Sequence, residues 1–243
     1  MARTAASQAS LAVQVVVFGF DPDPGASPRS ALHVLTVRRS LPGGPVEAKE
    51  RFSEAALAYA ADAGVDVASK RSKARSPLHL VGLDDAPGRS RAVTAWYYAT
   101  VGFADVAEPG QWSSVHRAPK LDAGVSAALK ASLETLRSDT RQVAGAAALL
   151  GDVFTGDDLL RLHTALHGGP EGSERTFRRR IQELRDSGVL KPVRTNEVAA
   201  LRLRNPRFRS PAGTGGRPPE LLRYAGAGGE DEQLAGLRAR RTA

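Results

Sequence analysis

The chain has 243 residues, no cysteine and a formal charge of +8 at pH 7. That length allows one large domain or two smaller ones, and the lack of thiols excludes disulfides, thiolate-based zinc sites and cysteine nucleophiles. No apolar stretch reaches transmembrane length, and the short apolar run near the N-terminus does not fit a signal peptide. We therefore expect a cytoplasmic protein without membrane contact.

The first half of the chain is predicted to form strands with one early helix. The run from Leu11 to Phe20 is rich in valine and phenylalanine, which is typical of a strand. Two turns rich in Asp, Pro and Gly each lie between the two strands of a predicted pair. The strands are expected at residues 11–20, 31–38, 78–83, 92–101 and 110–115, the turns at 21–25 and 84–88, the helix at 53–63, and an exposed loop at 68–77.

The second half is predicted to be helical and then β. Thr155 is a suitable N-cap, and Asp157 and Asp158 follow in the first turn, where the helix dipole favours acids. Ser173 can cap the next helix, which Gly188 ends. Helices are expected at 122–137, 140–150, 155–168 and 173–187, and short strands at 189–193, 198–204 and 220–225.

Positive charge is concentrated near the C-terminus. Residues 171–224 contain thirteen basic and six acidic residues, a net charge of +7, which is nearly the whole excess of the chain. A concentrated basic patch favours a polyanionic partner. A solvated arginine-rich surface without a partner is the simpler alternative.

The predicted helix at 173–187 has two distinct faces. Phe177, Ile181 and Leu184 fall within about 60° of one another and form the inward face. The opposite side carries arginine and glutamine, which read guanine and adenine edges in the major groove. With the helix before it and the hairpin after it, this pattern is typical of a winged helix-turn-helix. The candidate DNA contacts are Arg175, Thr176, Arg178, Arg179 and Gln182 on the helix and Arg207, Arg209 and Arg217 on the wing.

The stretch LPGGPVEAKERFSEAALAYAADAGV, residues 41–65, resembles the loop-helix motif of Nudix hydrolases. In that family the motif is G-x5-E-x7-R-E-U-x-E-E-x-G-U, where U is aliphatic and the glutamates collect Mg²⁺ for diphosphate hydrolysis. The motif can be counted forward from Gly44, which puts Glu50 at the first glutamate, or back from Gly64. In both registers Asp62 is the only acid at the R-E-U-x-E-E positions, so neither a metal site nor catalytic residues are expected.

A Nudix-like domain followed by a winged helix resembles one family, the Nudix-related transcriptional regulators called NrtR. The resemblance rests on LPGGPVEA, FTGDDLLRLHTALHG, RTFRRRIQELRDSGVLKPV and GTGGRPPELLRYA, and it covers nearly the whole chain. It implies a homodimeric repressor that binds a double-stranded DNA operator. It also implies that the Nudix-like domain senses a nucleotide-derived effector such as ADP-ribose or an NAD-related compound, without a cofactor.

The chain departs from the family pattern at three places: a shorter loop before LPGG, Ala123 where a histidine often follows the aspartate, and a longer wing. For the effector we predict contacts from arginines, which suit a diphosphate. The candidate effector-binding residues are Arg38, Arg39, Arg89 and Arg91.

The expected fold class is α+β, with a Nudix-like α/β/α sandwich followed by a winged helix-turn-helix domain. The expected division is a disordered N-terminus at 1–10, a ligand-sensing and dimerisation domain at 11–140, a DNA-binding domain at 141–225, and a disordered tail at 226–243. Two alternatives remain open. The chain could be a hydrolase of nucleoside diphosphate derivatives with an unusual metal site, or a DNA-binding protein whose Nudix-like domain only dimerises.

Overall fold

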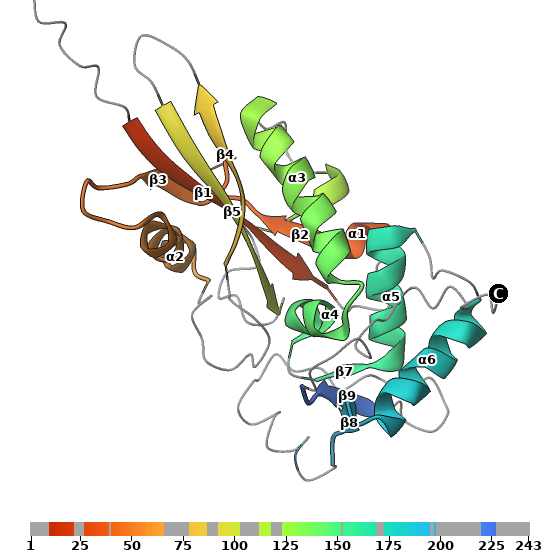
Figure 1. The fold of residues 1–243 in the computed structure, drawn as a ribbon. Helices are drawn as coiled ribbons and strands as arrows, with labels where there is room; N and C mark the ends of the chain where they lie inside the picture. The colour runs from red at the N-terminus through yellow and green to blue at the C-terminus, as the bar shows by residue number, and fades with distance from the viewer. Residues whose placement is uncertain are drawn as a thin grey trace, which may run out of the picture.

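The computed structural model describes residues 10–21, 27–38, 40–65, 78–86, 92–102, 112–117, 123–151, 153–168, 173–194, 197 and 220–226 (Figure 1). The strands are β1 Ser10–Phe20, β2 Leu32–Leu35, β3 Gly43–Pro45, β4 His79–Ala86, β5 Ala92–Gly102, β6 Trp112–Ser114, β7 Phe154–Thr155, β8 Leu190–Pro192 and β9 Leu221–Tyr224. The helices are α1 Pro28–Ala31, α2 Phe52–Asp62, the 3-10 turn η3 Val115–Arg117, α3 Ala123–Asp139, α4 Val143–Leu150, α5 Gly156–His167 and α6 Glu174–Asp186. None of the described helices is long and apolar enough to cross a membrane.

The centre of the fold is a six-stranded mixed sheet in the order β4-β5-β1-β2-β6, with β3 paired to β1. Strand β1 runs parallel to β5 along its whole length and antiparallel to β2. Because side chains alternate along a strand, Val13, Val15 and Val17 pack in the cluster with α2, whereas Val16 and Phe18 pack in the cluster with α3 and α4. Helices thus cover both faces of the sheet (Figure 1), and the predicted α/β/α sandwich is confirmed.

Both predicted strand pairs form. The pair at 11–20 and 31–38 is β1 with β2, and the pair at 78–83 and 92–101 is β4 with β5. The second strand, Leu32–Leu35, is shorter than predicted at both ends. Residues Pro28–Ala31 form a helical turn before it, and a tight turn closed by Val37 and Ser40 follows it. Proline at the start of a helix has its φ angle already fixed and loses no hydrogen bond there, which favours the helical turn.

The second half adds four helices and a small sheet in the order β7-β9-β8. One continuous apolar cluster runs from Phe18 and Tyr98 of the large sheet, through Leu149 and Leu162, to Phe177 of α6. The division between 11–140 and 141–225 therefore stays a prediction. The predicted loop at 68–77, the predicted strand at 198–204 and the two terminal segments 1–9 and 227–243 lie outside the described residues.

The packing of β3 against β1 requires a glycine at position 43, the first glycine of the Pro-Gly-Gly sequence. Gly43 pairs with Gln14 of β1, and a Cβ atom added to it would lie 2.3 Å from the carbonyl oxygen of Val13. No L side chain fits this close approach of two backbones. A Cβ added to Gly82 on β4, by contrast, would meet nothing within 4 Å.

We predict that Gly43→Ala lowers the free energy of unfolding by about 1–3 kcal/mol, since β3 must move away from β1 to admit the methyl group. Urea unfolding followed by circular dichroism measures the change. Gly82→Ala is the matched control, and equal stability of the two variants would contradict the proposed clash.

Candidate nucleic-acid interface

Helix α6 is capped at both ends by its own sequence. The Ser173 hydroxyl accepts a hydrogen bond from the Thr176 amide at 3.2 Å, and Glu174 lies in the first turn. Gly188 follows the helix with φ +80°, a conformation that glycine adopts without strain. The helix therefore spans nearly the predicted range.

The inward face of α6 is the predicted one. Phe177, Ile181 and Leu184 are 6%, 7% and 1% exposed and belong to the large apolar cluster, together with Leu222 of β9. Burying each such side chain stabilises the fold by about 1.5–3 kcal/mol. This face holds α6 against α5 and the small sheet, so its other face is turned to solvent.

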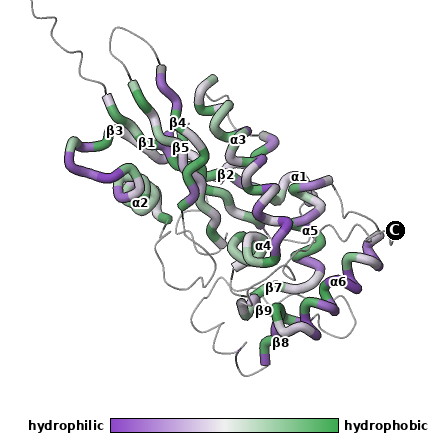
Figure 2. The backbone as a smooth tube through the Cα atoms, in the orientation of Figure 1, coloured by the Kyte–Doolittle hydropathy of each residue, from purple (hydrophilic) through white to green (hydrophobic). Residues whose placement is uncertain are grey.

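The outer face of α6 carries the predicted reading residues. All five candidates on this helix are exposed, and α6 is among the most hydrophilic helices in Figure 2. They are Arg175, Thr176, Arg178, Arg179 and Gln182. The structure thus brings these five side chains onto one solvent-facing surface, and their contact with DNA stays a prediction.

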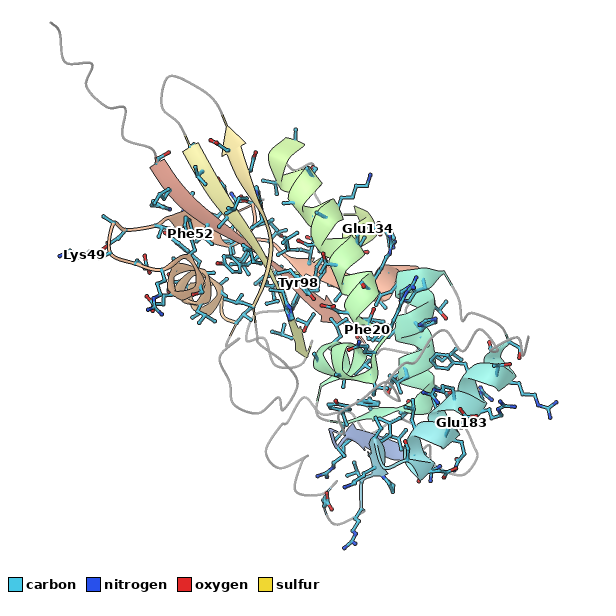
Figure 3. The ribbon with its side chains drawn as sticks, in the orientation of Figure 1. Phe20, Lys49, Phe52, Tyr98, Glu134 and Glu183 are labelled. Carbon is cyan, nitrogen blue, oxygen red and sulfur yellow. The ribbon has the colours of Figure 1, made fainter. Side chains whose placement is uncertain are left out.

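Acidic side chains already engage part of this surface. Arg178 lies 3.6 Å from Asp157 of α5 and 4.0 Å from Glu174. Arg179 pairs with Glu183 at 3.2 Å, on the part of α6 where Figure 3 labels Glu183. Exposed ion pairs of this kind contribute at most about 1 kcal/mol each. A phosphate or a base edge can therefore replace the carboxylates.

Gln182 is engaged in the same way, because its amide donates to the Asp186 carboxylate at 2.9 Å. The pairing of Arg178 with Asp157 across two helices was missed by the sequence analysis. The acids of the first turn of α5 were visible in the sequence, but only the tertiary packing of α5 and α6 brings Asp157 to Arg178.

Helix α5 packs against the inward face of α6. Thr155 caps it in a reciprocal box: its hydroxyl accepts from the Asp158 amide at 3.0 Å, and its own amide donates to the Asp158 carboxylate at 2.8 Å. Burial raises the pKa of Asp158, against the lowering effect of these hydrogen bonds. Gly168 ends the helix with φ +80°. The predicted N-cap and glycine stop of this helix are confirmed.

A buried histidine lies between α5 and α6. His163 is 3% exposed, and its ring centroid is 4.5 Å from that of His167 and 5.3 Å from that of Phe177. Burial, followed by the nearby positive charges of His167 and Arg141, lowers the pKa of His163 to about 4. The ring is therefore neutral at pH 7 and packs as an aromatic side chain under α6.

The remaining candidate residues are not brought together by the described part of the chain. Arg38 is exposed in the tight turn between Val37 and Ser40, where its φ is +51°. The three other predicted effector arginines, Arg39, Arg89 and Arg91, lie outside the described residues. So do the wing arginines Arg207, Arg209 and Arg217.

The structure resolves the register of the Nudix-like motif. Gly64 follows α2 with φ +83°, and the next residue, Val65, is 1% exposed. A glycine followed by a buried aliphatic residue is the end of the motif, so the register counted back from Gly64 applies. The metal-binding glutamate positions of the helix then fall on Ala58, Ala61 and Asp62, all of which are exposed.

In this register the first glutamate position of the motif falls on Lys49, on the loop before α2 at the edge of the molecule (Figure 3). The neighbouring acids serve the backbone: Glu50 accepts from the Glu47 amide at 3.4 Å, and Glu54 accepts from the Arg51 amide at 3.3 Å. Within the described ranges, no three His, Cys, Asp or Glu side chains are grouped so that they could hold a metal ion.

Tyr59 fills the space beside the Gly-Gly strand. Its hydroxyl donates to the carbonyl oxygen of Pro45 at 2.9 Å, and a Cβ added to Gly44 would lie 2.4 Å from that hydroxyl. The end of β3 is thus held against α2 by a neutral hydrogen bond.

No protein-family model and no curated protein matches the chain. Among solved structures, the NrtR protein of Shewanella oneidensis complexed with a 27mer DNA matches with a TM-score of 0.61 and 19% identity, over 88% of this chain and 93% of that chain. A second structure of that NrtR matches with a TM-score of 0.59 and 18% identity, over 88% and 94% of the chains. A MutT/nudix family protein from Enterococcus faecalis matches with a TM-score of 0.55 and 12% identity, over 92% and 89%. The chain therefore has the fold of these Nudix-related proteins, and the predicted resemblance in fold is confirmed.

We predict that His163 makes the protein less stable as the pH is lowered. Its pKa is lowered from 6.5 to about 4 in the folded chain, so the unfolded chain binds more protons between these pH values. The free energy of unfolding is then fully retained above pH 6.5 and decreases as the pH falls toward 4, by up to about 3 kcal/mol.

The melting temperature of the protein and of His163→Phe, measured from about pH 7 to pH 4.5, checks this prediction. Phenylalanine keeps the ring against Phe177 and removes the titrating nitrogen. The variant should lose less stability than the natural protein over this range, and an identical decrease in both would contradict the assignment.

Proposed function

We propose that this protein is a DNA-binding transcriptional regulator of the NrtR type. The observation that carries the proposal is the exposed arginine and glutamine surface of α6, seated by an apolar face on α5. Arginine and glutamine match the hydrogen-bonding edges of guanine and adenine in the major groove. The likeness to Shewanella oneidensis NrtR, which was crystallised with DNA, supports the same reading.

The DNA-binding part is a winged helix-turn-helix in this proposal. The order α4, β7, α5, α6, β8, β9 supports it, with α5 and α6 as the two helices and β8 and β9 as the base of the wing. α6 is the recognition helix that enters the major groove. The wing arginines Arg207, Arg209 and Arg217 contact phosphates or the minor groove.

The Nudix-like part senses a ligand and forms a homodimer, and the protein acts as a repressor. Alanines and one aspartate at the glutamate positions of α2 argue against metal-dependent hydrolysis and leave the scaffold free for binding. The ligand is a nucleotide-derived compound such as ADP-ribose, with Arg38, Arg39, Arg89 and Arg91 as its candidate contacts.

A hydrolase of nucleoside diphosphate derivatives is the second candidate, favoured by the match to the Enterococcus faecalis MutT/nudix family protein. Release of AMP from ADP-ribose in the presence of Mg²⁺ would support it. No release above the buffer rate with several dinucleotide substrates would end it.

The test of the recognition helix is Arg179→Ala. We expect this change to weaken binding to the operator by about 1–3 kcal/mol, because the side chain reads a base edge, and to leave random DNA nearly unaffected. Fluorescence anisotropy on both duplexes at one salt concentration measures this. Lys130→Ala on α3, another exposed position, removes the same charge and is the control.

Equal losses on operator and random DNA for Arg179→Ala would contradict base reading. A loss as large for Lys130→Ala would mean that only the overall charge matters.

A second prediction concerns Asp157, the α5 partner of Arg178. Asp157→Asn should raise the affinity for random duplex DNA about two- to fivefold at low salt, since a phosphate no longer competes with the carboxylate. It should also make the salt dependence steeper, by up to one released counterion. Asp62→Asn removes the same charge from the distant α2 and should change neither quantity. If both variants behaved alike, the pair would have no specific role.

A further inference from the structure

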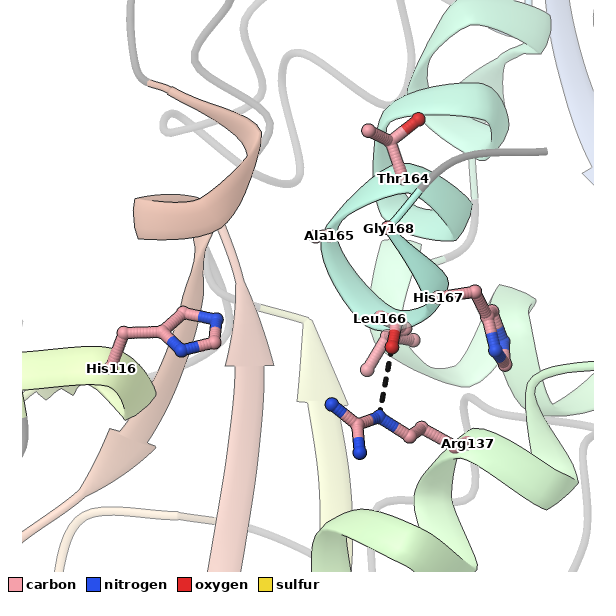
Figure 4. A pocket seen from close by; sticks show the side chains of 7 residues that line it. All are labelled: His116, Arg137, Thr164, Ala165, Leu166, His167 and Gly168. Atoms are coloured by element: carbon pink, nitrogen blue, oxygen red, sulfur yellow. Dashed lines mark hydrogen bonds between the residues drawn. The ribbon is translucent and has the colours of Figure 1, made fainter.

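An open groove of about 470 Å³ lies between η3, α3 and the last turn of α5 (Figure 4). Its lining residues are His116, Arg137, Thr164, Ala165, Leu166, His167 and Gly168. This volume is within the range of small-ligand sites, about 300–1,000 Å³.

The groove presents nitrogen donors to a ligand. In Figure 4 the Arg137 guanidinium and the His116 ring face each other from its two sides. Among the seven lining residues none is acidic. Guanidinium and imidazole donors together favour an oxyanion.

Arg137 is held in position for this role. Its Nε donates to the Leu166 carbonyl oxygen at 2.8 Å, and one Nη donates to Glu134 at 2.8 Å. Within the described part of the chain, its other Nη makes no hydrogen bond. A guanidinium that is fixed through two of its nitrogens loses little freedom when the third binds a ligand.

We propose that this groove binds a small molecule that carries a phosphate group, between Arg137 and His116. The groove lies at the C-terminal end of α5, whereas Asp157, which meets Arg178 of α6, lies about 15 Å away near its other end, at 1.5 Å of helix per residue. The site is therefore separate from the Arg178 side of the α6 surface.

The groove is connected to α6 through α5. Arg137 holds the carbonyl oxygen of Leu166, and the next residue, His167, has its ring against His163, which in turn lies against Phe177 of α6. A ligand that binds Arg137 therefore acts on the last turn of α5, which carries Leu166 and His167. Its effect on DNA affinity rests on the proposed function, but its binding to the groove does not.

The binding is tested by titrating the protein with inorganic phosphate and following the His116 ring and Arg137 Nε signals by nuclear magnetic resonance. We expect saturable shifts in the protein and in Lys130→Gln, and at least a tenfold weaker response in Arg137→Gln and in His116→Ala. His116 is exposed, so its variant tests the site without disturbing the Arg137 bonds. Linear shifts, or shifts reproduced by chloride at equal ionic strength, would overturn the proposal.

A second arm separates a free phosphate compound from a DNA phosphate. For a small ligand, Arg137→Gln and His116→Ala bind random duplex DNA as the natural protein does. Weaker duplex binding by both variants, together with no phosphate saturation, would show that the groove takes the DNA backbone and would overturn the proposal.

The third arm tests the connection to α6. Saturating phosphate at constant ionic strength should change operator affinity at least threefold in the protein and not in Arg137→Gln. Saturable binding without this change would overturn the connection. Saturable binding by a protein that fails to select its operator would instead count against the proposed DNA-binding function and leave the site intact.

Discussion

The close packing of α4 holds the molecule together. This helix is rich in alanine, and its buried Val143, Ala146 and Leu149 belong to the apolar cluster that joins the large sheet to α5 and α6. Small side chains let it approach tightly: a Cβ added to Gly145 would lie 2.4 Å from the carbonyl oxygen of Asp139. The Tyr98 hydroxyl of β5 donates to the Asp139 carboxylate just before this helix. The α6 surface is thus seated on the sheet through continuous, close-packed contacts.

This packing gives the proposed regulator a physical basis. A protein interior that is close-packed transmits a local displacement to its neighbours instead of absorbing it. In the described structure two contacts can transmit a displacement to the helices that pack against α6. One is the packing of α4 on the large sheet, and the other is the bond from Arg137 of α3 to α5. Coupling between a ligand and DNA then requires only that the two ligands favour different arrangements of these contacts.

Sequence patterns predicted the elements whose side chains repeat regularly. The valines of β1 and the Phe177, Ile181 and Leu184 stripe of α6 follow the periods of strand and helix, so their inward faces were predictable. Strands β3 and β7 have three and two residues, too few for any period. The register of the Nudix-like motif needed the backbone of Gly64, and the Asp157 to Arg178 pair needed tertiary packing, which local sequence does not encode.

Regulation of DNA binding by a ligand is measured most directly by fluorescence anisotropy of the protein on the DNA upstream of its own gene and on a scrambled duplex, at one salt concentration, with and without ADP-ribose. We expect the protein to bind the upstream DNA at least about a thousandfold more tightly than the scrambled duplex, and we expect ADP-ribose to change that affinity. Equal affinity for the upstream and the scrambled duplex, together with no preferred sequence in a selection from a pool of random duplexes, would contradict the proposed regulator.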